Sequence, residues 1–184
     1  MSKNKIIFAG VVILGIVAIF AYGNFNNSNT DSGLSSRETS NSEGYLLSVP
    51  NLNFEIIFPA EPQFNRTDGE DFTRHSWSYI DNSPDGRVGL FVQAENNLYA
   101  YNSSQEDFIE QTAQIYGGVV SRMEKDPNAP ATDYEITGVY SNSSPDTETI
   151  VGRIIDVGEW TFNITNQFEG VNRYPDFIAS FKQI

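Results

Sequence analysis

Three stretches of the chain differ in how their apolar and polar residues are arranged. Residues 6–22 form one apolar run without a charged residue, and residues 23–44 are rich in Asn, Ser, Thr and Gly. From residue 45 to residue 184, short apolar runs alternate with polar and turn-forming residues. The pattern predicts a transmembrane helix, a flexible polar linker and one folded domain.

The apolar run Ile6–Tyr22 would be about 25 Å long as a helix, close to the ~30 Å hydrocarbon core of a membrane. Lys3 and Lys5 precede it, and the next basic residue is Arg37. This excess of positive charge before the run predicts that residues 1–5 are cytoplasmic and that the domain lies outside the cytoplasm. We therefore expect a single-pass plasma-membrane protein with a signal-anchor.

The alternative interpretation of the same segment is a cleaved signal peptide. Ala21 and Gly23 are small residues spaced like a cleavage site, so cleavage near Gly23 would release a secreted or periplasmic domain. The apolar run exceeds the roughly 7–15 residues of a signal-peptide core, and Tyr22 lies where an interfacial aromatic residue belongs. These two features favour the uncleaved anchor.

Short or alternating apolar runs predict the strands of the domain. In the clearest run, Glu159–Phe168, apolar and polar residues alternate. Its residues expected to point inward are Trp160, Phe162 and Ile164. Those expected to point outward are Thr161, Asn163 and Thr165. The other predicted strands are Tyr45–Val49, Phe54–Phe58, Phe72–Ile80, Val88–Glu95, Val119–Glu124, Tyr134–Ser141 and Ile150–Val157.

Two helices are expected from residues at helical spacing. The first begins near Ser103 or Ser104, since Ser103 and Glu106 fit a capping box, and it ends at Gly117. Its apolar stripe consists of Phe108, Ile109, Thr112, Ala113 and Tyr116. The second runs from about Arg173 to Lys182 and presents Tyr174, Phe177, Ile178 and Phe181. The order of elements predicts an α+β fold, with helices packed on an antiparallel sheet.

This order and three segments resemble a known family. The segments are FEIIFPAEP at Phe54–Pro62, a central amphipathic helix that ends in glycines, and a hairpin followed by the closing YPDFIASFKQI. They resemble the PsbP-like family, named after an extrinsic subunit of photosystem II. The resemblance implies an α/β/α sandwich and a role as an assembly factor or binding module. It covers most of residues 45–184, assigns no functional residue and does not imply photosynthesis.

The charge and cysteine content exclude several classes of function. The net charge is −13, and because the charges of residues 1–44 cancel, the whole excess lies on the domain. An acidic domain repels phosphate backbones, so nucleic-acid binding is not expected. The chain has no Cys, which excludes disulfides, thiolate nucleophiles and Cys-ligated metals. There is no phosphate-binding glycine loop, and no cofactor is expected.

The single histidine is the first candidate for catalytic chemistry. His75 lies in an alternating strand beside Trp77 and Tyr79, so we expect a structural side chain rather than a catalytic base. No Gly-x-Ser-x-Gly motif accompanies it. A Ser–His–Asp triad stays open, because its components are common residues.

Two acidic segments are candidates for binding a hard cation such as calcium. The first contains Asp68, Glu70 and Asp71, and the second contains Asp81 and Asp85. The second segment does not fit an EF-hand loop, since its twelfth position is Val92 where a bidentate Glu is required. We expect solvated acidic turns in both places, and metal binding stays an open alternative.

The predicted function is a binding or assembly module without enzymatic activity. We expect it to contact the membrane through the N-terminal helix and to bind a protein partner outside the cytoplasm. One alternative is an extracytoplasmic hydrolase or metal-dependent enzyme. Another is a structural envelope protein that binds copies of itself.

Overall fold

The computed structural model of the chain describes residues 40–41, 44–98, 104–140 and 147–184. The predicted transmembrane segment Ile6–Tyr22 and nearly all of the linker lie outside these ranges, so both stay predictions. Within the described ranges, no helix is long and apolar enough to cross a membrane.

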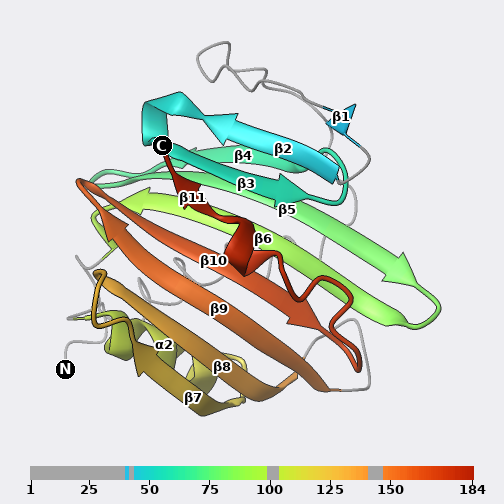
Figure 1. The fold of residues 1–184 in the computed structure, drawn as a ribbon. Helices are drawn as coiled ribbons and strands as arrows, with labels where there is room; N and C mark the ends of the chain where they lie inside the picture. Colours follow the sequence, from blue (N-terminus) through green and yellow to red (C-terminus); the bar gives the residue numbers. More distant parts are fainter. Residues whose placement is uncertain (1–39, 42–43, 99–103, 141–146) are drawn as a thin grey trace.

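The centre of the fold is a seven-stranded antiparallel sheet (Figure 1). Two meanders build it, one from β4 to β6 and one from β7 to β10, and they join where β6 pairs with β10. In spatial order its strands are β4 (Gln63–Asp68), β5 (Thr73–Ser83), β6 (Gly86–Asn96), β10 (Trp160–Phe168), β9 (Thr147–Val157), β8 (Ala131–Tyr140) and β7 (Val119–Lys125).

A smaller sheet packs on one face of the large sheet, which we call the hairpin face. It contains β1 (Ser40–Asn41), β2 (Gly44–Val49), β3 (Phe54–Phe58) and β11 (Lys182–Gln183), and a 3-10 turn, η1 (Pro50–Leu52), connects β2 to β3. Phe54 is fully buried and makes edge-to-face contacts with Trp77 and Phe162 of the large sheet. Alternate apolar residues thus join the two sheets.

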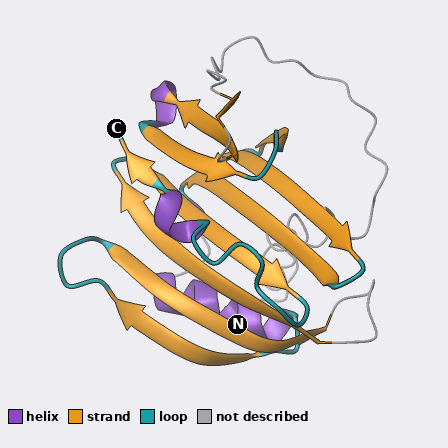
Figure 2. Ribbon diagram, turned by 45° about the vertical axis from the view of Figure 1, so that its right-hand side comes forward, coloured by secondary structure: helices purple, strands orange, loops and turns teal. Residues whose placement is uncertain are grey.

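The helix α2 (Gln105–Ile115) lies on the opposite face of the large sheet, which we call the helix face (Figure 2). Ser104 caps it by accepting a hydrogen bond from the Asp107 N–H, so the helix begins where the sequence predicts, one residue after the expected capping box at Ser103. Phe108, Ile109 and Ala113 pack in one cluster with Tyr134, Ile136 and Ile154. Ile155, which follows Ile154 in β9, belongs to the core on the hairpin face, because successive residues of a strand point to opposite faces.

The predicted fold class is wrong. The structure is mostly β, with 60% strand and 14% helix, and it has two antiparallel sheets. Helix α2 covers one face of the large sheet, and the small sheet rather than a second helix covers the other. The predicted helix at residues 173–182 is absent. In its place are a 3-10 turn, η3 (Ile178–Ser180), and β11, which pairs with β3.

The physical reason for the missing helix lies in Asn172 and Tyr174. The Asn172 side chain accepts a hydrogen bond from the Tyr174 N–H, and the Asn166 side chain donates to the Tyr174 carbonyl. Side chains therefore hold the backbone where the helix was expected to begin, and the backbone hydrogen bonds that follow form only short turns. Phe177 packs on Phe58, so the apolar spacing fills a core without forming a helix.

The strand β4 was also missed by the sequence pattern. Its residues, Gln63–Asp68, are nearly all polar and exposed, and only Phe64 packs on the core. The strand is held by pairing with β5 across the turn at residues 69–72. Pairing with a neighbour, rather than burial of alternate residues, creates this edge strand.

Candidate functional site

The structure places His75 inside the core and away from the surface hollows. It is buried on β5, stacks with Phe64 and Trp77, and makes an edge contact with Trp160 at a centroid distance of 5.3 Å. Its surroundings are therefore aromatic rings that join β4, β5 and β10.

The first acidic segment forms the turn between β4 and β5. Asp68 Oδ1 accepts hydrogen bonds from the Thr73 hydroxyl at 3.0 Å and from Arg66 Nε at 3.1 Å. These contacts, the Thr73 hydroxyl first, hold the pKa of Asp68 below its usual value. In the described part of the chain, no three His, Cys, Asp or Glu residues are grouped to hold a metal ion.

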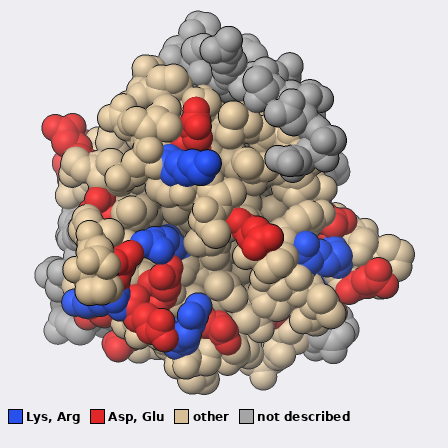
Figure 3. All heavy atoms as spheres, viewed as in Figure 1, with Lys and Arg blue, Asp and Glu red and all other residues tan. Residues whose placement is uncertain are grey.

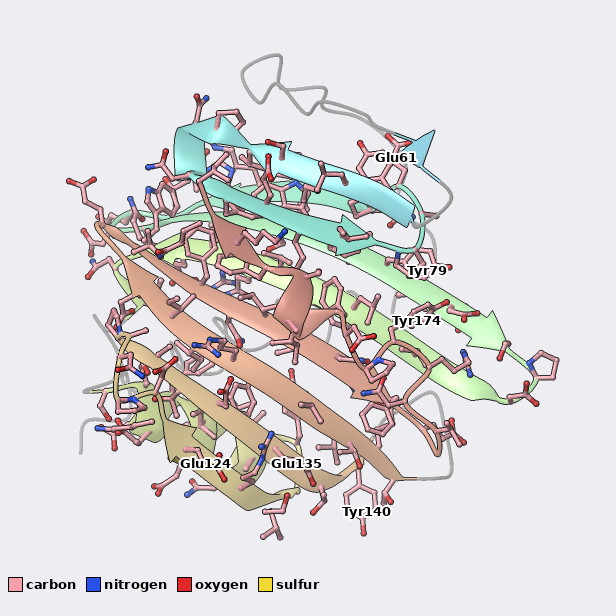
Figure 4. All side chains as sticks on the ribbon, viewed as in Figure 1. Glu61, Tyr79, Glu124, Glu135, Tyr140 and Tyr174 are labelled. Atoms are coloured by element: carbon pink, nitrogen blue, oxygen red, sulfur yellow. The ribbon has the colours of Figure 1, made fainter. Side chains whose placement is uncertain are left out.

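The second acidic segment is divided between two environments. Asp81 lies in β5, where its Oδ2 accepts hydrogen bonds from Tyr174 Oη at 2.9 Å and from Arg173 Nε at 3.2 Å. Asp85 lies in the exposed turn before β6. Asp81 therefore anchors the segment that follows β10, and Figure 4 shows Tyr174 beside Tyr79 on β5.

A cleft of about 310 Å³ lies between the start of α2, the turn that joins β7 to β8, and the end of β9. Three structural elements that are distant in sequence meet here. The cleft is lined by Ser104, Gln105, Glu106, Lys125, Asp126, Ala129, Pro130, Ala131, Thr132 and Asp156.

The floor of the cleft is a hydrogen-bonded network centred on Gln105. Its side-chain N–H group donates to Asp156 Oδ2 at 2.9 Å and to the Pro130 carbonyl at 3.1 Å. The buried Thr132 hydroxyl donates to Gln105 Oε1. Thr161 Oγ1 donates to the second oxygen of Asp156 at 2.7 Å. These bonds fix the first residue of α2 to β8, β9 and β10.

The rim of the cleft is charged and negative overall. Two carboxylates of the rim, Glu106 and Asp126, outnumber Lys125, the single cation among the lining residues, and Asp156 on the floor adds a third negative charge. A hydrogen bond from Lys125 lowers the pKa of Glu106, and the Asn128 backbone N–H, followed by Arg153, lowers the pKa of Asp126. Both rim carboxylates are therefore ionised at neutral pH.

A group of charged residues, which we call the acidic patch, continues from the cleft onto the hairpin face of β7, β8 and β9. Arg153 connects the two regions, because its guanidinium lies 2.6 Å from Asp126 Oδ2 and 3.4 Å from Asp133 Oδ2. Figure 3 shows acidic and basic side chains gathered over these strands, and Figure 4 labels Glu124 and Glu135 among them. The patch consists of Arg122, Glu124, Asp126, Asp133, Glu135 and Arg153.

A second polar region lies on the helix face, and the sequence pattern misjudged it. Thr161, Asn163 and Thr165 were expected to point to solvent, but all three are buried. Near them, Arg74 Nε lies 2.6 Å from Glu95 Oε2, and Glu95 is 1% exposed. Burial raises the pKa of Glu95 although Arg74 opposes this shift. The void beside Asn163 and Gln93 is about 20 Å³, enough for roughly one water molecule.

Sequence reasoning named Ser104 and Glu106 among the cleft residues, but only for the start of the helix: Ser104 as one of two possible first residues and Glu106 as part of a capping box with Ser103. Gln105 and Asp156 are too far apart in sequence to form a motif, and they meet because the start of α2 lies beside the end of β9. The turn Asp126–Pro127–Asn128 was the one local signal, since Asp before Pro favours a turn.

No protein-family model matches the chain, and no curated protein matches it. The resemblance to the PsbP-like family therefore stays a prediction from the quoted segments.

Proposed function

We propose that the protein is a binding module that holds a positively charged segment of a protein partner in the cleft, with the acidic patch as its extension. The observation that carries this proposal is the cleft itself, with its negative rim and its hydrogen-bonded floor. A Lys or Arg side chain of the partner is the group that this chemistry fits.

The size and rigidity of the cleft support this proposal. Small-ligand pockets usually measure about 300–1,000 Å³, so the cleft suits one or two side chains rather than a large cofactor. Gln105 is held by three hydrogen bonds, two of which it donates and one of which it accepts. A floor that is ordered before binding loses little conformational entropy on binding.

The charge of the domain supports a basic partner. The acidic patch has four carboxylates against two guanidinium groups, and the whole chain has a net charge of −13. A field of this sign speeds the approach of a cationic partner, and salt weakens the effect. We therefore expect the association rate to fall steeply as salt is added.

The proposed location is the outer face of the plasma membrane, with Ile6–Tyr22 as the anchor. An anchor of this kind would raise the effective concentration of the domain toward membrane-bound partners. The location can be tested because the chain has no Cys. A Ser40→Cys variant should react with an impermeant thiol reagent on intact cells, and protection until lysis would contradict the outward orientation.

The binding proposal is tested by titrating the full chain with a short arginine-rich peptide and recording affinity by calorimetry. The variant Glu106→Gln/Asp126→Asn should bind at least about tenfold more weakly, because the rim loses two carboxylates. The matched control is Glu70→Gln/Asp71→Asn, which removes the same charge from the exposed turn after β4.

The control separates the cleft from the general acidity of the domain. Equal weakening in both variants would show that the peptide follows net charge and would overturn the cleft as a site. A photo-crosslinking group at Asn128, on the turn beside the cleft, should also label the peptide, whereas the same group at Asp85 should not. Labelling at Asp85 alone would contradict the proposal.

A further inference from the structure

The strand β7 forms one edge of the seven-stranded sheet. Among the described strands it pairs only with β8, and Val119, Arg122, Glu124 and Lys125 are all exposed. An edge strand has unpaired N–H and C=O groups along one side, which can accept another strand. The side chains of β7 then determine which strand can pair with this edge.

The side chains of β7 alternate between the hairpin face and the helix face of the large sheet. Arg122 lies opposite Glu135 and Glu124 lies opposite Asp133, so both belong to the hairpin face. Met123 lies opposite Tyr134 and packs on the helix face. Arg122 Nη1 lies 3.9 Å from Glu124 Oε2, at the distance limit of an ion pair, and both side chains are largely exposed. Their charges are therefore available to an incoming strand.

We propose that two copies of this chain associate through β7, antiparallel, about a two-fold axis that passes beside Met123. This pairing places Arg122 of each copy opposite Glu124 of the second copy, twice per dimer. Directly opposed residues of an antiparallel pair lie on the same face, about 4.5–5.5 Å apart between Cβ atoms. The strand is thus complementary in charge to itself.

Neighbouring registers are less favourable. A two-fold axis beside Arg122 would place the two Arg122 side chains opposite each other. An axis beside Glu124 would do the same with the two Glu124 side chains. Like charges directly opposite one another destabilise a sheet, and opposite charges stabilise it. A shift by one residue is excluded, because it would exchange the two faces of the sheet.

The bulge in β7 limits the extent of the contact. The register with β8 shifts between Val120 and Arg122, and the Ser121 hydroxyl donates to Glu135 Oε1 at 3.0 Å. Bulges and charges at an edge discourage indiscriminate pairing, whereas the regular stretch Arg122–Lys125 fits the proposed register. So short a contact is expected to give a weak dimer.

The dimer would have one sheet that runs through both copies, with the two acidic patches on the same side. This inference does not rest on the proposed function, because β7 pairs by its backbone and its own charges. If both hold, a dimer could bind a repetitive basic partner at two places.

The register is tested by disulfide crosslinking of the full chain in mild detergent, since the chain has no natural Cys. An equal mixture of Arg122→Cys and Glu124→Cys chains should give a covalent dimer on oxidation. Each variant alone should give much less, since diagonal Cβ atoms are about 7–8 Å apart and a disulfide needs ~3.5–4.5 Å.

The matched control is a mixture of Arg66→Cys and Asp68→Cys chains on β4, the edge strand at the opposite end of the sheet. These positions have the same spacing and are also exposed. The proposal would be overturned if this control, or Arg122→Cys alone, gave as much covalent dimer as the test mixture. The absence of any crosslinking in the test mixture would also overturn it.

Charge reversal gives a second readout without cysteine. Arg122→Glu or Glu124→Arg alone should weaken dimerisation at least about tenfold in sedimentation equilibrium, because each sets like charges opposite one another. The double variant Arg122→Glu/Glu124→Arg should restore the wild-type dissociation constant, since the pairs are only exchanged. Failure of the double variant to recover, with circular dichroism unchanged, would contradict the register.

Discussion

The two halves of the large sheet differ in what covers them. On the half formed by β4, β5, β6 and β10, the small sheet covers the hairpin face, and Trp77, Leu90 and Phe162 are buried beneath it. On the half formed by β7, β8 and β9, α2 covers the helix face, while Glu124 and Glu135 occupy the exposed hairpin face. One half is thus buried on the side where the other is open.

The difference shows how one sheet can serve two purposes. Alternate residues on the covered half are large and apolar, so they add to the core and to stability. On the open half, Ala131 and Ile155 still reach that core, but the alternate residues of β7 and the middle of β8 are charged and add little to stability. The cleft at the start of α2 lies at the end of the open half, and most of the described residues that line it are polar or charged.

The largest effect should come from the core of the covered half. Phe54→Ala removes a ring that contacts Trp77, Phe162 and Phe181, and should cost about 3–5 kcal/mol of unfolding free energy. Urea denaturation followed by Trp fluorescence measures it. Glu124→Ala on the open half should change stability by less than about 0.5 kcal/mol. Equal costs at both positions would remove the distinction between the halves.

The buried ion pair on the helix face should have the next largest effect. Glu95→Gln removes the carboxylate that forms an ion pair with Arg74, in a site where Arg74 is only 6% exposed. Loss of one member of a buried pair costs about 3 kcal/mol or more. The double variant Arg74→Met/Glu95→Leu should recover much of this loss in the same urea titration, because it removes both buried charges. A double variant as unstable as Glu95→Gln would show that the pair itself supplies the stability.

The clamp between β5 and the C-terminal segment should have a smaller effect. Asp81→Asn weakens the contacts to Arg173 and Tyr174, which are 3.0 and 2.9 Å long, and should cost about 1–3 kcal/mol. Thermal unfolding measures the loss, and limited proteolysis after residue 172 should become faster. Asp85→Asn, in the exposed turn nearby, is the control and should leave both unchanged. Faster proteolysis in both variants would assign the effect to net charge.

The sequence predicted the strands better than it predicted their covering layers. Short or alternating apolar runs identified β3, β5, β6 and β10 to within a few residues, because their apolar faces are buried in one core. This pattern failed for β4, which is stabilised by pairing and carries few apolar residues. Helical spacing also gave a wrong prediction at Tyr174 and Phe177. The two rings do not share a helix face, because Tyr174 packs against Tyr79 and Phe177 packs against Phe58.

The cleft could not be predicted from local patterns. Gln105 and Asp156 are 51 positions apart and meet because α2 begins beside the end of β9. Sequence reasoning also predicted the wrong environment for Thr161, Asn163 and Thr165, which it placed in solvent although they are buried. For example, Tyr134 Oη donates a hydrogen bond to Asn163 Oδ1 at 2.9 Å inside the protein. Polar residues in a strand therefore do not identify a solvated face when they can bond to buried partners.

The smallest expected effects concern the titration of carboxyl groups, and they should differ in sign between the halves. Burial raises the pKa of Glu95 on the covered half, whereas the Asn128 N–H and Arg153 lower the pKa of Asp126 on the open half. As the pH falls, the folded state therefore takes up a proton at Glu95 before the unfolded state does, which favours folding. Asp126 does the reverse, because its stabilisation is present above the unfolded pKa and is lost as the pH falls through the folded one.

Carbon-13 NMR of side-chain carboxyl groups can follow both residues in one titration. In Arg153→Gln, the pKa of Asp126 should rise but stay below the usual Asp value of 3.8, because the Asn128 backbone N–H is the larger cause and is retained. The pKa of Glu95 should not change, since Arg74 and Gln93 are its partners. A full return of Asp126 to 3.8 would show that Arg153, and not the turn, fixes the charge at the rim of the cleft. The negative rim would then depend on one guanidinium that a basic partner could displace, and recognition at the cleft would involve exchange of one arginine for another.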